Sequence, residues 1–236
     1  AAETLEDSIS DSALGYWAGS LGLRSDARMF AERGTYWKNT FNAAVGYQAA
    51  RQADGSWTPD WSPSTGTGFA QGTSAQYTWL VPQDVQGLSS ALGGDDATVA
   101  RLDDFFHDST GAFAVTGGDA TKFDPTNEPD IHTPWMYNAL GTPWKTQETV
   151  RRVVDDAYST GPGGLPGNDD LGTMSAWYVF ASIGLFPQTP GRAEMLIGSP
   201  TFSTVDIRRS SGERLVIRSS GTEPYVQGAR LNGWTH

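Results

Sequence analysis

The chain has 236 residues, of which 38% are apolar, so it can bury a sizeable core in one large domain or two small ones. Its 27 acidic and 16 basic residues leave a formal net charge of −11, which argues against nucleic acid or an anionic membrane as a partner. The absence of cysteine excludes disulfides, thiolate catalysis and cysteine-ligated zinc. No apolar run approaches the ~18 residues of a membrane-spanning segment, so we expect no membrane partner.

Apolar residues at helical spacing predict a series of helices, joined by polar loops, over residues 1–187. In chain order we expect helices at 5–21, 29–45, 80–92, 95–106, 133–140, 146–157 and 171–183. Asp95 or Asp96 should cap the fourth helix and Thr146 the sixth, whereas Gly184 should end the seventh.

After residue 187 the pattern changes to the alternation that is typical of strands. Residues 205–208 and 215–218 alternate apolar and polar side chains on either side of Ser210-Ser211-Gly212, which predicts a hairpin. Residues 225–231 are expected to form a further strand. We therefore predict a mainly α fold of helical hairpins over 1–187, followed by a small β-rich segment over 188–236.

The lengths of the connections indicate where a site could form. Long polar loops precede the third, fifth and seventh predicted helices, whereas short turns join the two helices of each pair. In an array of helical hairpins this pattern places the long loops at one end, and loops of about 12 or more residues inside a compact domain are usually functional. We therefore expect Gln71, Glu128 and the Asp169–Asp170 pair, one group from each loop, to converge.

The loop over residues 165–172 carries the strongest signal. Asp169 and Asp170 follow Asn168 in a Pro/Gly-rich turn that leads directly into a predicted helix. Glycines let the backbone turn sharply and approach a ligand closely, and the helix start offers unpaired N–H groups. An acidic residue at this place can also be a simple helix cap. Because the turn carries two carboxylates and an amide, we favour the functional interpretation.

The loop over residues 123–135 places carboxylates, an amide and an imidazole between prolines, which stiffen the loop. Its carboxylate and amide oxygens suit a hard cation such as Ca²⁺, although a solvated acidic turn explains them equally well. A lone histidine more often makes structural hydrogen bonds than acts as a base, so we assign His132 to binding. The chain lacks the phosphate-binding, dinucleotide-binding, zinc-protease and serine-hydrolase motifs. Carboxylate chemistry in an aromatic setting remains, as glycoside hydrolysis requires.

Three blocks of the sequence together resemble the signature blocks of glycoside hydrolase family 92, in the order of that family. They are Gln71-Gly72 with Gln76-Tyr77-Thr78-Trp79, then Asn127-Glu128-Pro129 with His132, then Gly167-Asn168-Asp169-Asp170-Leu171-Gly172 with Met174-Ser175-Ala176-Trp177-Tyr178. The resemblance implies a secreted, Ca²⁺-dependent, inverting exo-α-mannosidase with an N-terminal β-sandwich and a C-terminal (α/α)6 barrel. It also implies that this chain is the C-terminal part, with the β-sandwich and the rest of the barrel on a preceding segment.

The resemblance also implies roles for individual residues. Asp170 matches the base that activates water, and Asp169 or Asn168 would support it. Glu128 and His132 match positions that line the Ca²⁺ and the mannose. The remaining positions expected to contact the substrate are Asn127, Gly72, Thr73 and Trp135.

The sequence departs from the family at the general acid, which is a glutamate in a Glu-Gly-Asn block and is replaced here by Gln71-Gly72-Thr73. An amide cannot protonate a leaving alkoxide, and general acid catalysis typically contributes ~10²–10⁴-fold. A phosphate ester oxygen, in contrast, leaves as a stable anion that a carboxylate would repel. We therefore expect hydrolysis of α-mannose-1-phosphate diesters, such as mannose-1-phosphoryl-6-mannose on N-glycans, by analogy with a subgroup of the family that is similar in carrying such a glutamine.

Other functions remain open at this stage. The protein could be an ordinary exo-α-1,2-mannosidase whose acid comes from elsewhere, for example from Asp124 or Asp130. It could also be an inactive mannan-binding module that binds sugar with Ca²⁺ and releases none. A toroid lyase is a more distant alternative, because it would normally need a tyrosine or histidine base.

Overall fold

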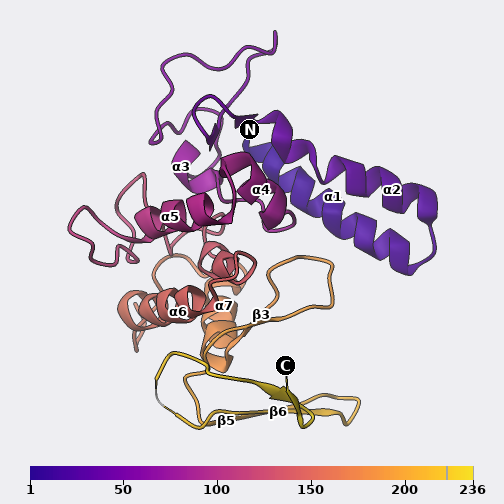
Figure 1. Ribbon diagram of the computed structural model, residues 1–236, viewed down its shortest axis with the longest axis vertical. Coiled ribbons are helices and arrows are strands. Elements are labelled where there is room, and N and C mark those ends of the chain that lie inside the picture. The colour runs from indigo at the N-terminus through magenta and orange to yellow at the C-terminus, as the bar shows by residue number, and fades with distance from the viewer. Residues whose placement is uncertain (222, 236) are drawn as a thin grey trace.

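The computed structural model describes residues 1–221 and 223–235. The chain is mostly helical, with a few short strands (Figure 1). Its α-helices are α1 (Ala2–Ser20), α2 (Arg24–Arg33), α3 (Ser74–Tyr77), α4 (Val85–Leu92), α5 (Asp95–Phe106), α6 (Pro143–Ala157) and α7 (Thr173–Ile183). Two 3-10 helices, η1 (Tyr36–Asn39) and η2 (Thr133–Asn138), complete the helical part. Within the described residues, no helix is long and apolar enough to cross a membrane.

The strands form separate antiparallel pairs rather than one sheet. In chain order they are β1 (Phe41–Asn42) with β2 (Tyr47–Gln48), β3 (Leu185–Phe186) with β4 (Leu196–Ile197), β5 (Thr204–Arg208) with β6 (Arg214–Arg218), and β7 (Arg230–Leu231) with β8 (Trp234–Thr235). The predicted hairpin is confirmed as β5–β6, in register from Thr204 opposite Arg218 to Arg208 opposite Arg214. The strand expected over 225–231 is wrong for most of its length, because only Arg230 and Leu231 are paired.

The N-terminal helices form a hairpin that projects from the body (Figure 1). Gly15 of α1 permits close packing, since a Cβ there would lie 3.1 Å from the backbone nitrogen of Ala31 in α2. The predicted helix over 29–45 is wrong beyond Arg33. The helix ends at Arg33, and the chain turns inward after Gly34. The fully buried Trp37 then donates a hydrogen bond to Asp84 at 3.1 Å.

Helix starts differ from the predictions by a few residues. Asp84 caps α4 by accepting from the backbone N–H of Gly87 at 3.0 Å, so the helix begins after the predicted Leu80. α5 starts at Asp95 behind Gly94. α6 starts at Pro143, which is favourable at a first helical position, and Thr146 therefore lies inside the helix rather than at its cap. The predicted end of α7 is confirmed at Gly184, where φ is +76°.

An aromatic core joins the helices and lies beneath the long loops. Phe105, Phe106 and Phe123 pack with ring centroids between 5.1 and 6.4 Å apart. Trp79 contacts Phe105 and Tyr137 contacts Phe106, so α5, η2 and the segment after α3 share one cluster. Much of the aromatic content of the sequence therefore serves packing rather than ligand contact.

Candidate functional site

The loops that carry Gln71 and Glu128 meet directly. Gln71 precedes α3, which is fixed by a capping box between Thr73 and Gln76. The Nε2 of Gln71 donates to Oε2 of Glu128 at 3.4 Å. Asn127 donates from its side-chain amide to the backbone carbonyl of Gln71. Asn127 and Glu128 therefore hold the backbone and the side chain of Gln71, although both lie far from it in the sequence.

The two carboxylates of the acidic turn, residues 165–172, make different contacts. Asp169 accepts hydrogen bonds from the backbone N–H of Ser175 at 2.8 Å and from its hydroxyl at 2.7 Å. It therefore caps α7 by pairing a free N–H of the first turn, although the N-cap residue itself is Gly172. These bonds, led by that of the Ser175 hydroxyl, lower the pKa of Asp169 below its usual range. The carboxylate of Asp170 is exposed and makes no hydrogen bond to any described residue.

Backbone strain is concentrated at the same turn. Asp170, Leu171 and Gly172 have φ values of +36°, +60° and +92°. Left-handed conformations cost non-glycine residues about 1–3 kcal/mol and cluster at functional sites. The strained backbone separates Asp170 from the capping Asp169 and leaves its carboxylate in solvent, free to act on a ligand.

The acidic turn also rests against the Glu128 loop. A Cβ at Gly167 would lie 2.8 Å from the Cβ of Thr126 and 2.9 Å from its carbonyl oxygen, which shows how closely the two backbones approach. The Glu128 loop therefore contacts both of the other loops, through Asn127 and Glu128 at Gln71 and through Thr126 at Gly167. Among the described residues, no hydrogen bond joins Asp169 or Asp170 to Gln71 or Glu128.

Three residues that were expected to contact substrate lie instead in the interior. Trp135 is fully buried and stacks on Phe186 with ring centroids 4.8 Å apart. The Thr73 hydroxyl takes part in the cap of α3 and donates to the carbonyl of Ala120 at 2.6 Å. His132 is buried, and its Nε2 donates to the carbonyl of Trp79 at 2.7 Å. Burial lowers the pKa of His132 to about 4, so its ring is neutral at pH 7.

The remaining predicted residues stay accessible. Asn168 is exposed beside Asp169, and Gly72 is partly exposed next to Gln71. Gly72 lies close to the Glu128 loop, since a Cβ there would be 3.4 Å from the side-chain nitrogen of Asn127. The sequence left a capping role open for an acidic residue of this turn, but it could not assign that role to Asp169, because a spacing of six residues to Ser175 has no established signature.

The whole chain, residues 1–236, matches the model of the glycosyl hydrolase family 92 catalytic domain. The chain belongs to glycosyl hydrolase family 92. The structure superposes on the family 92 α-mannosidase BT3965 from Bacteroides thetaiotaomicron with a TM-score of 0.89, at 32% identity over 98% of this chain and 31% of that one. The inverting mannosidase BT2199 from the same species gives 0.86 at 31% identity, covering 99% of this chain and 34% of that one.

A curated relative extends the comparison to fungi. An uncharacterized secreted glycosidase of Arthroderma benhamiae is 27% identical over 260 residues, which cover 98% of this chain and 32% of the relative. A further structure of BT3965, in complex with mannoimidazole, is 30% identical and has a TM-score of 0.88, with 98% of this chain and 32% of that one covered. The chain therefore spans about a third of the length of these family 92 relatives.

The family resemblance implies Ca²⁺, and the residues present fit it in part. Glu128 suits a hard cation, because its Oε1 is buried and no described residue offers it a hydrogen bond. His132 does not fit, since its Nε2 is engaged by Trp79 and such cations prefer oxygen ligands. Within residues 1–221 and 223–235, no three histidine, aspartate or glutamate side chains gather closely enough to hold a metal.

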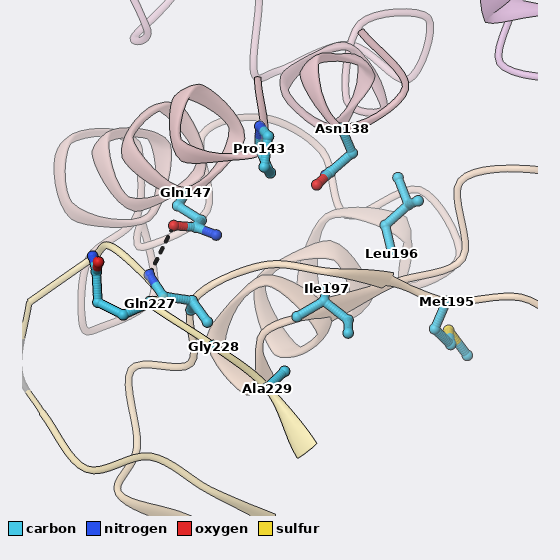
Figure 2. Close-up of a pocket in the computed structure, with 10 residues that line it drawn as sticks. Asn138, Pro143, Gln147, Met195, Leu196, Ile197, Gln227, Gly228 and Ala229 are labelled. Atoms are coloured by element: carbon cyan, nitrogen blue, oxygen red, sulfur yellow. Dashed lines mark hydrogen bonds between the residues drawn. The ribbon is translucent and has the colours of Figure 1, made fainter. Parts of the chain in front are cut away.

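A groove of about 360 Å³ lies apart from the predicted site residues, between α6, β4 and residues 226–229 (Figure 2). The backbone N–H of Val226 donates to Oε1 of Gln147 there, at 2.9 Å. The side chains that line the groove are apolar or amides, and none of them is titratable. It therefore offers no acid–base chemistry, and the loops with Gln71, Glu128 and Asp170 remain the candidate active site of this family 92 chain.

Proposed function

We propose that the protein is an inverting glycoside hydrolase that releases α-mannose, with Asp170 as the general base. The observation that carries this proposal is that Asp169 is hydrogen-bonded to Ser175, whereas the carboxylate of Asp170 is exposed. An inverting enzyme needs a carboxylate that accepts a proton from water on one face of the sugar. Asp169 is a poor candidate because the hydrogen bonds from Ser175 stabilise its charged form and make it a weaker base. Asp170 is exposed and carries no such bonds.

Gln71 leads us to propose α-mannose-1-phosphate diesters as the preferred substrates. Among the described residues, the carboxylate bonded to Gln71 is that of Glu128, which accepts a hydrogen bond from it and therefore acts as an acceptor there. A leaving group at this place receives no proton from Gln71. A phosphate ester does not need one, because it leaves as a stable anion.

The contacts of Gln71 also support a binding role toward phosphate. A carboxylate can only accept, so the side-chain nitrogen of Gln71 faces Glu128 and its orientation is fixed. The amide group has a second N–H, which is available to a phosphate oxygen. The neutral amide adds no negative charge beside the anionic leaving group.

The two acids considered as substitutes are poorly placed to protonate a substrate. Asp130 is fully buried, and one of its carboxylate oxygens accepts from the backbone N–H of Asp124 at 2.9 Å. Burial raises the pKa of Asp130 well above its usual range, and the same burial keeps its carboxyl out of reach of a substrate. Asp124 is occupied by the backbone N–H and hydroxyl of Thr126, at 2.9 and 2.7 Å. These contacts weigh against an ordinary α-mannosidase that borrows its acid from this loop.

We further propose that Ca²⁺ is the cofactor, that mannose-containing glycans or phosphoglycans are the substrates and that the protein is secreted. Glu128 would hold the cation through Oε1, with Asn127 beside it, and the bound cation would polarise and orient sugar hydroxyls. The mannoimidazole complex of BT3965 and the secreted fungal glycosidase support the sugar and the location. The remainder of an (α/α)6 barrel, on a preceding segment, would complete the site.

The test compares mannose release from an α-mannose-1-phosphate diester and from unactivated α-mannobiose, each with and without EDTA, using the full-length protein. We expect faster release from the diester and loss of activity with EDTA. Equal or faster cleavage of mannobiose would show that the protein is an ordinary α-mannosidase. If neither substrate is cleaved while mannan still binds, the protein is a binding module.

A further inference from the structure

A buried hydrogen bond ties α7 to the Glu128 loop. Trp177 lies in the second turn of α7 and is only 2% exposed. Its indole N–H donates to the backbone carbonyl of Ile131 at 2.7 Å. Since α7 begins right after the acidic turn and Ile131 closely follows Glu128, this bond connects the two halves of the candidate site.

A second aromatic residue fixes the orientation of the indole. Tyr158, which directly follows α6, lies parallel to Trp177 with ring centroids 5.6 Å apart and an interplanar angle of 8°. Its hydroxyl donates to the carbonyl of Met174 in the first turn of α7 at 3.2 Å. The start of α7 is therefore held from α6 as well as from the Glu128 loop.

We propose that Trp177 is a positioning residue whose bond to Ile131 sets the spacing between Asp170 and the Gln71–Glu128 pair. This inference rests on the proposed function. An inverting enzyme must leave room for one water between its base and the sugar, with catalytic groups about 6.5–9.5 Å apart. A displacement of about 1 Å can lower the rate ~10²-fold. Only contacts outside the reacting groups can set this spacing here.

The chain offers a matched control at Trp135. This tryptophan is also buried, at 0% exposure, and it also stacks on an aromatic ring, that of Phe186, at 4.8 Å and 6°. Its indole nitrogen, however, has no hydrogen-bond partner among the described residues. A Trp→Phe change removes a similar ring area at either site, but it breaks a hydrogen bond only at Trp177.

The experiment measures kcat, KM and thermal stability for Trp177→Phe and Trp135→Phe in the full-length protein, with an α-mannose-1-phosphate diester. We expect kcat to fall about 10–100-fold in Trp177→Phe while KM changes less than about threefold. Trp135→Phe should lose less thermal stability, because it breaks no hydrogen bond, and it should keep kcat within about threefold. Equal losses of kcat in the two variants would show that Trp177 serves packing alone.

Hydrogen exchange separates this inference from the proposed function. Amide exchange over 165–176 should accelerate in Trp177→Phe and remain unchanged in Trp135→Phe, whether or not the protein hydrolyses mannosides. If wild-type protein is inactive, the proposed function fails while exchange still decides the positioning role. Unchanged exchange in Trp177→Phe would overturn that role. If Trp177→Phe does not fold, Tyr158→Phe takes its place. This variant keeps the stack on Trp177 and loses only the hydrogen bond to Met174. We expect faster exchange at the same residues.

Discussion

Replacing Gln71 by glutamate should convert the pair with Glu128 into a general acid. In the wild-type chain the Nε2 of Gln71 lies 3.4 Å from Oε2 of Glu128, and this contact is attractive. Gln71→Glu replaces the donor with a second carboxyl at nearly the same place. Two carboxylates this close cannot both ionise easily, so without a bound cation the introduced group should keep its proton to a higher pH than an isolated glutamate. Ca²⁺ held by Glu128 would reduce this rise, because its charge favours the ionised carboxylates.

The distance between Gln71 and Glu128 sets the size of the effect. Two unit charges 3.4 Å apart repel by about 5 kcal/mol at an effective dielectric constant of about 20, and by about 1 kcal/mol in bulk water. Because Gln71 is exposed, the true value lies between these limits. At ~1.4 kcal/mol per unit, the pKa of the introduced carboxyl should rise by about one to three units from ~4.3. That range approaches neutrality, where a general acid is most effective.

The assay is kcat/KM against pH for α-mannobiose and for the phosphodiester, with Gln71→Met as a neutral control that cannot donate. Gln71→Glu should raise mannobiose hydrolysis by ~10²-fold or more, with activity falling as pH rises through the raised pKa. It should lower phosphodiester hydrolysis, because the ionised fraction repels the leaving group. Gln71→Met should lower phosphodiester hydrolysis and leave mannobiose hydrolysis unchanged. If Gln71→Glu abolishes both activities, or adds no new limb to the pH profile, the reasoning about the leaving group is wrong.

Further predictions concern the loops that build the site. Gly167→Ala should lower stability in chemical denaturation by about 1–3 kcal/mol, since its Cβ would lie 2.9 Å from the carbonyl oxygen of Thr126. Gly163→Ala, with open space around its Cβ, should be neutral in the same measurement. Ser175→Ala should raise the pKa of Asp169 in NMR titration. Because the native pKa of Asp169 is lowered, the stability difference between Ser175→Ala and wild type should be present at neutral pH and vanish as pH falls through the native pKa. His132, whose pKa falls from 6.5 to about 4, must remain neutral in the fold, so stability should drop by up to about 3 kcal/mol as pH falls from 6.5 to 4. His132→Gln should flatten that dependence, and an unchanged slope would place the titration elsewhere.

Local signals were sufficient for the parts of the fold in which neighbouring residues decide the structure. The left-handed glycine that ends α7 and the alternation in β5–β6 are examples. The helix predicted over 29–45 failed because Gly34 packs against α1 and Trp37 turns into the core, contacts that no local pattern records. The start of α6 was missed because Thr146 has the chemistry of a cap, although Pro143 already begins the helix.

The site was predictable at the level of loops more than of side chains. Helix pairing correctly brought Gln71 and Glu128 together, because it depends on connection lengths. Burial could not be inferred for His132, Thr73 or Trp135. Polar and aromatic side chains in a long loop either face a ligand or make the hydrogen bonds and packing contacts of the loop itself, and the sequence does not distinguish the two. Here they satisfy the loop, through the carbonyls of Trp79 and Ala120 and through aromatic stacking.

The central claim, that Asp170 is the base and Asp169 the cap, is tested most directly by rescue with azide, a nucleophile that needs no deprotonation. Asp170→Gly should fold normally, because glycine tolerates the φ of +36° at this position, and should lose phosphodiester hydrolysis. Azide should then restore turnover with formation of β-mannosyl azide. Asp169→Gly should lose stability and gain nothing from azide. Rescue of Asp169→Gly, with Asp170→Gly unaffected by azide, would contradict the assignment.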